Sequence, residues 1–238
     1  MSLGEIITDS IKYPFSNITN FLIVGILVLL AGISNVFMTY GISNEALNVI
    51  GGIIGLIFTL ILSGYSLDII KYAFDNSDEY PMIDIAANFV DGVKVLIINI
   101  IYFIVPIFIT LILAVITGAI GAGLNHLCTG LGIAAIISMI VFIIFGIFEV
   151  IAIARFAEPG RLDEAFKFGA VIEDIQRIGF AKVIAFLIIA VIIIAIAAVI
   201  GSLLTFIPVI GVLLSSIVLG GFIILFYNRG IGLLYADA

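Results

Sequence analysis

The chain has 238 residues, of which 64% are hydrophobic and only 11% are charged, and its mean hydropathy is +1.43. About a quarter of the residues of a soluble globular domain are charged, so this composition excludes a soluble fold and indicates an integral membrane protein. The formal net charge of −7 argues against nucleic acid as a partner, because binding to a phosphate backbone requires a basic surface.

Six apolar segments approach or exceed the length of about 20 residues that a helix needs to cross a bilayer. The expected spans cover residues 20–40, 47–74, 95–118, 131–155, 180–204 and 209–227. No segment of substantial length remains for a soluble domain. The sequence therefore predicts an all-α polytopic protein, with residues 1–238 forming one membrane domain in the lipid bilayer.

Each pair of spans follows a segment in which polar and apolar residues recur with the period of a helix. These segments are residues 3–16, 84–94 and 161–178. Charged side chains fall on one face and apolar side chains on the other, which is the pattern of helices that lie in the membrane interface. We expect three such amphipathic helices on the cytoplasmic side.

An acid and a base three residues apart recur in the three amphipathic segments, and an aromatic residue followed by alanine recurs at or after the second span of each pair. The motifs are Asp9 with Lys12, Asp91 with Lys94, Asp174 with Arg177, and Tyr72-Ala73, Phe156-Ala157 and Tyr235-Ala236. They predict a three-fold repeat with units 1–74, 75–158 and 159–238, all in the same orientation. The alternative is that such short motifs arise from composition alone.

Basic residues are distributed unevenly between the two sides of the predicted topology. All nine Lys and Arg residues lie before the first span, in the segments that join spans two to three and four to five or in the span ends next to them, or near the C-terminus. Basic residues close to span ends are retained in the cytoplasm. We therefore expect a multi-pass protein of the cell membrane with both termini in the cytoplasm.

Several short motifs resemble a prokaryotic, largely archaeal membrane family that is known as domain of unknown function 4013. They are Gly64-Tyr65, Asp78-Glu79-Tyr80-Pro81, Phe89-Val90-Asp91-Gly92-Val93-Lys94, Tyr102, Pro106 and the stretch 155–166. The chain departs from the family where members often carry a tryptophan after the proline, since it contains no Trp. The resemblance implies a multi-span protein of the cytoplasmic membrane, and it carries over neither an activity nor catalytic residues.

Glu149 is the acidic residue expected deepest in the hydrocarbon. It lies six residues before Arg155, or roughly 9 Å along a helix at 1.5 Å per residue. An intramembrane acid is a candidate site for a cation or a proton, here with Asn99 or Tyr102 as neighbours. The alternative is that Glu149 reaches the interface or pairs with a basic group there.

Three further charged residues are candidate functional residues. Asp68 can pair with Lys71 at the inner end of the second span, and this pair favours an anchor at the interface over a gate. Asp91 and Lys94 belong to the second amphipathic segment, where they would present charge at the membrane surface.

The sequence offers no recognisable metal, cofactor or catalytic motif. Asp75, Asp78 and Glu79 could collect a divalent cation, but their spacing does not match a calcium-binding loop and favours a solvated acidic turn. His126 and Cys128 are two ligands, too few to close a tetrahedral site. Phosphate-binding loops, dinucleotide fingerprints and zinc-protease motifs are absent from the sequence, so we expect neither a cofactor nor an enzymatic activity.

We therefore expect a non-enzymatic membrane scaffold or accessory subunit whose amphipathic helices present charge to lipid head groups or to a partner. That partner would be a second copy of the chain or another membrane protein. The alternative is a permease for an ion or a small solute, with its pathway between the repeats.

Overall fold

The computed structural model describes residues 1–42, 44–123, 127–207 and 210–237, and the side chains of residues 118–131 fall outside this description. The described part is helical and contains no strand. Its elements are α1 (Leu3–Ser16), α2 (Ile18–Ala31), α3 (Ile33–Thr39), α4 (Glu45–Phe74), α5 (Ile85–Gly123), α6 (Leu127–Ala157), α7 (Leu162–Ala165), α8 (Phe168–Ile178), α9 (Phe180–Leu204), α10 (Ile210–Leu214), η1 (Ser215–Gly220) and α11 (Gly221–Tyr235).

Five helical segments are long and apolar enough to cross a membrane, and the described part holds a sixth if α1 and α2 are counted as one span. The five segments are Glu45–Phe74, Ile85–Thr117, Gly132–Ala157, Phe180–Leu204 and Ile210–Tyr235. This confirms the prediction of an all-helical multi-pass membrane protein. The first expected span, residues 20–40, is divided between α2 and α3 at Gly32.

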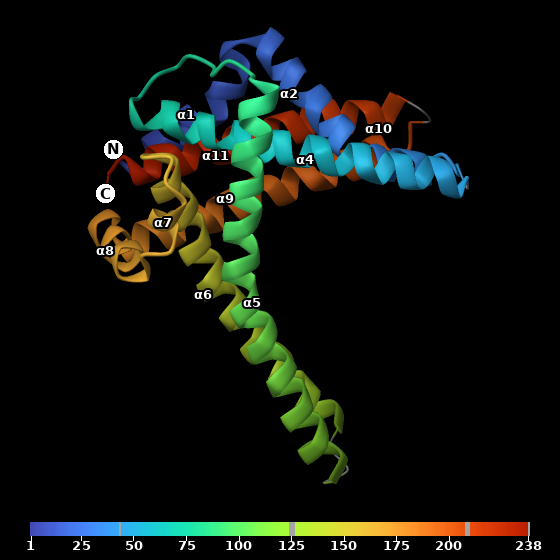
Figure 1. Cartoon of the computed structure of the whole chain (residues 1–238), viewed down its shortest axis with the longest axis vertical. Helices are drawn as coiled ribbons and strands as arrows, with labels where there is room; N and C mark the ends of the chain where they lie inside the picture. The colour runs from blue at the N-terminus through green and yellow to red at the C-terminus, as the bar shows by residue number, and fades with distance from the viewer. Residues whose placement is uncertain (43, 124–126, 208–209, 238) are drawn as a thin grey trace.

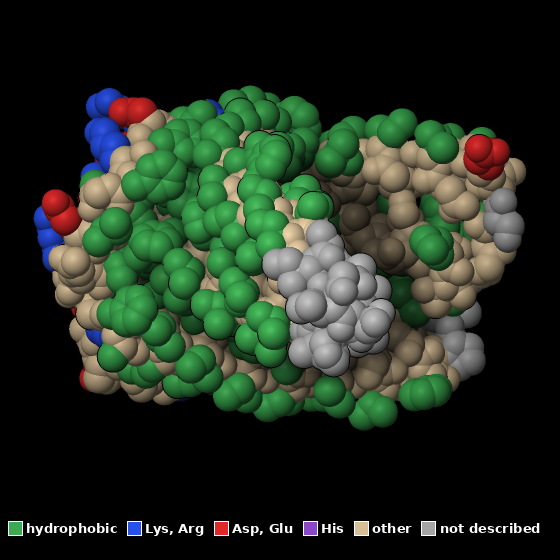
Figure 2. Space-filling view, turned by 90° about the horizontal axis from the view of Figure 1, so that it is seen from below, with side chains coloured by type: hydrophobic (Ala, Val, Ile, Leu, Met, Phe, Trp, Pro, Cys, Tyr) green, Lys and Arg blue, Asp and Glu red, His purple; other side chains and the backbone are tan. Residues whose placement is uncertain are grey.

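The molecule consists of a helix bundle and a long hairpin that projects away from it. Figure 1 shows α4, α9 and α11 running side by side, whereas α5 and α6 form the hairpin. The bundle and the hairpin meet where α4, α6 and α11 end, next to α7, α8 and both chain termini. We refer to this region as the charged end, because Figure 2 shows acidic and basic side chains gathered there, with one acidic patch at the opposite end.

The hairpin takes its direction from α5, which continues without a break where the corresponding chain segments end one helix and begin another. The chain turns by 91° between α1 and α2, where the side chain of Asn17 caps α2 by accepting from the N–H of Asn20. Gly179, with φ of +96°, separates α8 from α9. In contrast, α5 begins at Ile85 and continues into the third span without a break. The separate amphipathic helix expected over residues 84–94 is therefore wrong, because no capping residue or positive φ interrupts the chain there.

The third amphipathic segment is also divided. Residues 161–178 form the short helix α7 and then α8, with Phe166 and Lys167 between them. In this respect the prediction of one continuous helix is wrong.

The three-unit repeat stays a prediction, but the three acids share a pattern of burial. In each helix, three residues near the acid are buried, at the positions three before it, one after it and four after it. They are Ile6, Ser10 and Tyr13 for Asp9; Asn88, Gly92 and Val95 for Asp91; and Val171, Ile175 and Ile178 for Asp174. Each helix therefore uses the same face to pack against the bundle, whatever the origin of the motifs.

The helices α4 and α5 cross with their backbones in contact. A Cβ atom added to Gly64 would lie 1.9 Å from the carbonyl oxygen of Asn88, and one added to Gly92 would lie 1.8 Å from that of Leu60. Only glycine permits this approach, as in other close-packed membrane helices. The crossing fixes the base of the hairpin against the bundle.

Candidate functional site

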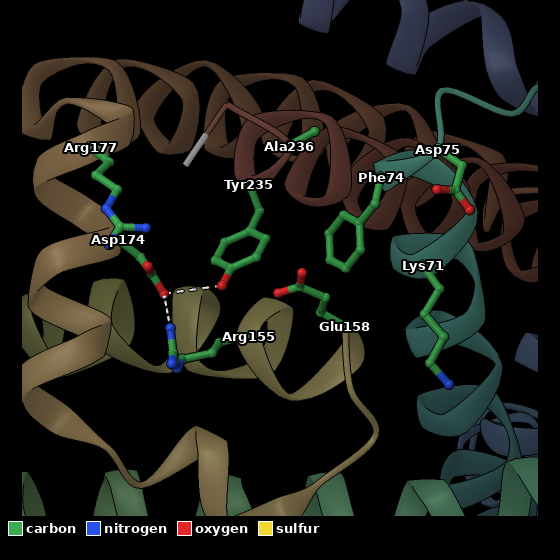
Figure 3. A pocket seen from close by; sticks show the side chains of 9 residues that line it. All are labelled: Lys71, Phe74, Asp75, Arg155, Glu158, Asp174, Arg177, Tyr235 and Ala236. Atoms are coloured by element: carbon green, nitrogen blue, oxygen red, sulfur yellow. Dashed lines mark hydrogen bonds and ion pairs between the residues drawn. The ribbon is translucent and has the colours of Figure 1, made fainter.

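A polar cavity of about 570 Å³ opens at the charged end, where three of the membrane-spanning helices finish. Its walls come from α4, α6, α8 and α11 (Figure 3). The lining residues are Lys71, Phe74, Asp75, Arg155, Glu158, Asp174, Arg177, Tyr235 and Ala236. Six of these nine residues are charged, three basic and three acidic, so the cavity brings charges of both signs together.

Arg155 ties α6 to the neighbouring helices at one wall of the cavity. Its guanidinium donates to Asp174 Oδ2 at 2.7 Å and to Glu164 Oε2 at 3.0 Å. The hydroxyl of Tyr235 donates to the same Asp174 oxygen at 3.0 Å. Asp174 is buried, and two donors compensate its charge. One arginine therefore joins α6, α7 and α8, and Tyr235 adds α11.

Glu164 is held in its charged form by two basic residues. Hydrogen bonds from Lys167, at 2.5 Å, and from Arg155 lower the pKa of Glu164 below its ordinary value, although burial acts in the opposite direction. The carboxylate therefore stays ionised in mildly acidic solution.

Other charged groups of the cavity are open to a partner. Arg177, Asp75 and Glu158 form no ion pair with any residue that the structure describes, and Figure 3 shows the Glu158 carboxylate between Tyr235 and Phe74. Lys71 lies 3.4 Å from Asp68, a long ion pair. The wall thus offers charges of both signs, which suits ion pairs with a charged partner or head group.

Asp68 lies beside the cavity, at the α4–α5 crossing. Its Oδ2 accepts from the amide of Asn88 at 2.6 Å, and its Oδ1 accepts from Lys71. The Asn88 oxygen accepts from the N–H of Asp84, just before α5 begins. The predicted pairing of Asp68 with Lys71 is confirmed, and the carboxylate also fixes the base of the hairpin.

Asp91 and Lys94 pair with each other on α5. Lys94 Nζ lies 2.6 Å from Asp91 Oδ1 and 6.0 Å from the centre of the Phe156 ring. The ammonium group is therefore held between α5 and α6 by its acid and by a cation–π contact.

Glu149 is separate from these pairs and lies within the hairpin. With the Asn99 amide oriented so that its nitrogen donates, that nitrogen lies 2.9 Å from Glu149 Oε1 and 3.1 Å from the carbonyl oxygen of Val95. Asn99 is thus a neighbour of Glu149, as expected. The hydroxyl of Tyr102 instead donates to the carbonyl oxygen of Ala165 at 2.7 Å.

A polar cluster that was missed from the sequence is centred on the buried Arg229 of α11. Arg229 is 1% exposed, and its guanidinium donates to Asp9 at 2.7 Å, to Asp78 at 3.0 Å and to the carbonyl oxygen of Ser77. It also stacks over the ring of Tyr13, 4.9 Å from the ring centre. This one side chain joins α1, α11 and the connection between α4 and α5.

Tyr80 completes the cluster around Arg229. Its ring stacks on Tyr13 with 4.7 Å between the ring centres, and its hydroxyl donates to the carbonyl oxygens of Tyr13 and Pro14. Burial raises the pKa of Tyr80 to about 12, so the hydroxyl remains a donor at neutral pH. The motif that contains Tyr80 therefore serves to attach the α4–α5 connection to α1.

A signal for both arginine clusters was present in the sequence. Two acids of the repeated motif pair with arginines near the ends of membrane-spanning helices: Asp9 pairs with Arg229, and Asp174 pairs with Arg155. Asp91 pairs instead with Lys94 of its own motif. Matching the motif acids with the arginines of the span ends would have suggested these pairs.

Among the described residues, no three His, Cys, Asp or Glu side chains lie close enough together to hold a metal ion. Asp78 of the expected acidic turn is engaged with Arg229. His126 and the side chain of Cys128 lie outside the described residues.

One family model matches the chain. The model of a protein family of unknown function, DUF4013, matches residues 47–206, which is more than half of the chain. No curated protein and no solved structure is significantly similar to the chain.

Proposed function

The chain belongs to the DUF4013 family of proteins of unknown function, and we propose that it is a non-enzymatic membrane scaffold or accessory subunit. In this proposal the charged end lies in the cytoplasm of the cell, with both termini on that side of the cell membrane. The charges around its cavity bind lipid head groups or the charged side chains of a partner membrane protein, which includes a second copy of the chain.

The observation that carries the proposal is that some charged residues at the charged end form ion pairs between helices, whereas others form none. Arg155 and Arg229 are committed to ion pairs that join helices to one another. Arg177, Glu158 and Asp75 line the cavity without an ion pair among the described residues. The internal ion pairs thus hold the helices together, whereas the remaining charges are exposed at the cavity of the charged end. Exposed charges of this kind are suited to binding a charged partner.

The alternative is a permease, and one observation favours it. Glu149 and Asn99 are hydrogen-bonded between α5 and α6, and Glu149 lies about two turns before the end of α6 at Ala157. A carboxylate at such a depth is costly unless it is paired, and pairs of this kind line ion and proton pathways. In that case the pathway would follow the hairpin and would not pass through the cavity at the charged end.

Two measurements on purified protein distinguish the proposals. Ion and solute flux is measured in liposomes for wild type, for Glu149→Gln and for Glu173→Gln, which removes an exposed acid of α8 as a matched control. The scaffold proposal predicts flux equal to that of empty liposomes in all three. Flux that is present in wild type and in the control but lost in Glu149→Gln would establish the permease instead.

The scaffold proposal is tested by cross-linking in native membranes. We expect Arg177→Gln combined with Glu158→Gln to reduce the yield of a specific cross-linked complex several-fold, whereas Glu173→Gln leaves it unchanged. An identical yield in all variants would show that the cavity charges bind no partner.

A further inference from the structure

The helix α9 is attached to the rest of the bundle at two separate places. Near the charged end, the Phe186 ring packs so closely on Gly230 that an added Cβ would lie 2.6 Å from the ring. There Lys182 also binds Asp237 and the carbonyl oxygen of Met1. At the other end, a Cβ added to Gly201 would lie 2.7 Å from the Ser215 hydroxyl. Between these places, α9 and the bundle enclose a gap.

This gap is an apolar cavity of about 390 Å³. Its walls come from α1, α2, α9, η1 and the start of α11. The lining residues are Phe15, Phe21, Ile193, Ile196, Ala197, Ile200, Val218, Leu219 and Phe222. Their side chains offer no hydrogen-bonding group, so water gains nothing by entering, and an empty gap would forfeit the dispersion contacts of its walls. A hydrocarbon occupant restores these contacts.

The cavity opens to the side, toward the hydrocarbon of the bilayer. Phe21 and Ala197 form its floor and are each 5% exposed, whereas Phe15, Ile196 and Ile200 form an exposed rim. A volume of about 390 Å³ is too small for a transmembrane helix, because a single turn of a cylinder about 10 Å wide and about 5.4 Å long already fills roughly 420 Å³. A single flexible hydrocarbon chain does fit, since the volume lies within the range of small-ligand pockets, about 300–1,000 Å³.

Lys12 of α1 lies within one helical turn of Phe15, which belongs to the rim of the cavity. Lys12 precedes Phe15 by three residues on α1, so the two side chains project from the same face of the helix. Lys12 is exposed and forms no ion pair with any described residue. It is therefore available to an anionic group whose hydrocarbon chain passes Phe15 into the cavity.

We propose that the cavity between α2, α9 and η1 holds one hydrocarbon chain of an anionic membrane lipid whose phosphate lies against Lys12. The site is distinct from the polar cavity at the charged end and does not depend on the scaffold function. The bound chain would fill the space beside α9 between its two contacts with the bundle.

The test uses tryptophan fluorescence, because the natural chain contains no Trp. Phe21→Trp places a single reporter on the cavity floor. Val191→Trp places one on the opposite face of α9, where the native residue is 65% exposed, as a matched control. Each variant is reconstituted in bilayers of phosphatidylcholine with increasing fractions of phosphatidylglycerol that carries brominated chains, which quench the fluorescence on contact.

We expect half-maximal quenching of Phe21→Trp at a several-fold lower fraction of brominated phosphatidylglycerol than for Val191→Trp. Brominated phosphatidylcholine should show a smaller preference, and Lys12→Gln should remove the difference between the two lipids. Ala197→Phe, which fills the cavity, should reduce the quenching of Phe21→Trp and leave that of Val191→Trp unchanged. If Ala197→Phe fails the check of folding by circular dichroism, Ala197→Leu replaces it.

Two results would overturn the proposal. Equal quenching curves for Phe21→Trp and Val191→Trp would show that the cavity takes lipid no differently from the general surface. A preference for phosphatidylglycerol that survives Lys12→Gln would refute the assignment of the head group.

Discussion

Replacement of Arg229 by methionine tests whether the buried arginine cluster holds the bundle together. Methionine keeps much of the side-chain volume but removes the guanidinium and with it the contacts to Asp9, Asp78 and Ser77. The helices α1 and α11 and the connection between α4 and α5 then lose their common link. We expect a marked loss of stability with the same helical content.

The magnitude follows from what happens to the two acids that lose their partner. Removing one member of a buried ion pair costs about 3–5 kcal/mol when the other charge stays buried. Here the side chains of Asp9 and Asp78 are 33% and 82% exposed, so water can solvate both carboxylates after the substitution. The expected loss is therefore about 2 kcal/mol, below that range and typical of the loss of charged hydrogen bonds.

The assay is equilibrium unfolding in detergent, followed by circular dichroism as the fraction of denaturing detergent rises. Arg161→Met is the matched control, because Arg161 also binds an acid, Asp163, but both side chains are exposed. The control should unfold at the same fraction of denaturing detergent as the wild type, since an exposed ion pair contributes little to stability. If Arg229→Met also unfolds with the wild type, the cluster does not stabilise the fold and our reasoning is wrong.

Three further predictions concern backbone contacts and charge. Gly92→Ala should destabilise by about 2 kcal/mol or more in the same unfolding assay, because the new Cβ meets the carbonyl oxygen of Leu60, whereas Gly146→Ala has nothing within 4 Å and should be neutral. Gly179→Ala should cost more than about 1 kcal/mol, since its φ of +96° strains any other residue, and an unchanged midpoint would contradict this. The pKa of Glu164 is lowered on folding, so its contribution to stability is present above the ordinary pKa of glutamate, about 4.3, and is lost as the pH falls further. The melting temperature of the wild type should therefore be higher than that of Glu164→Gln at pH 7, and this difference should vanish at low pH.

Hydropathy and helical period were sufficient to predict most of the membrane-spanning helices, because both are local properties of the chain. They also placed α1, and they placed Asn99 beside Glu149, since helices of an antiparallel pair bring such residues together. The partners of Arg229 and Arg155 could not be found in this way. Asp9 is 220 residues from Arg229, and only the packing of α1 on α11 makes them neighbours.

The direction of the hairpin depends on one difference that local pattern did not reveal. Asn17 follows the acid Asp9 by eight residues, and its side chain caps α2 at the 91° bend. Asn99 follows Asp91 by the same interval, but its amide faces Glu149 and the carbonyl oxygen of Val95 inside the continuous α5. An asparagine caps a new helix only when its side chain is free to turn back on the backbone. The carboxylate of α6 therefore holds the Asn99 side chain away from a capping position, and α5 continues without a break from Ile85 to Gly123.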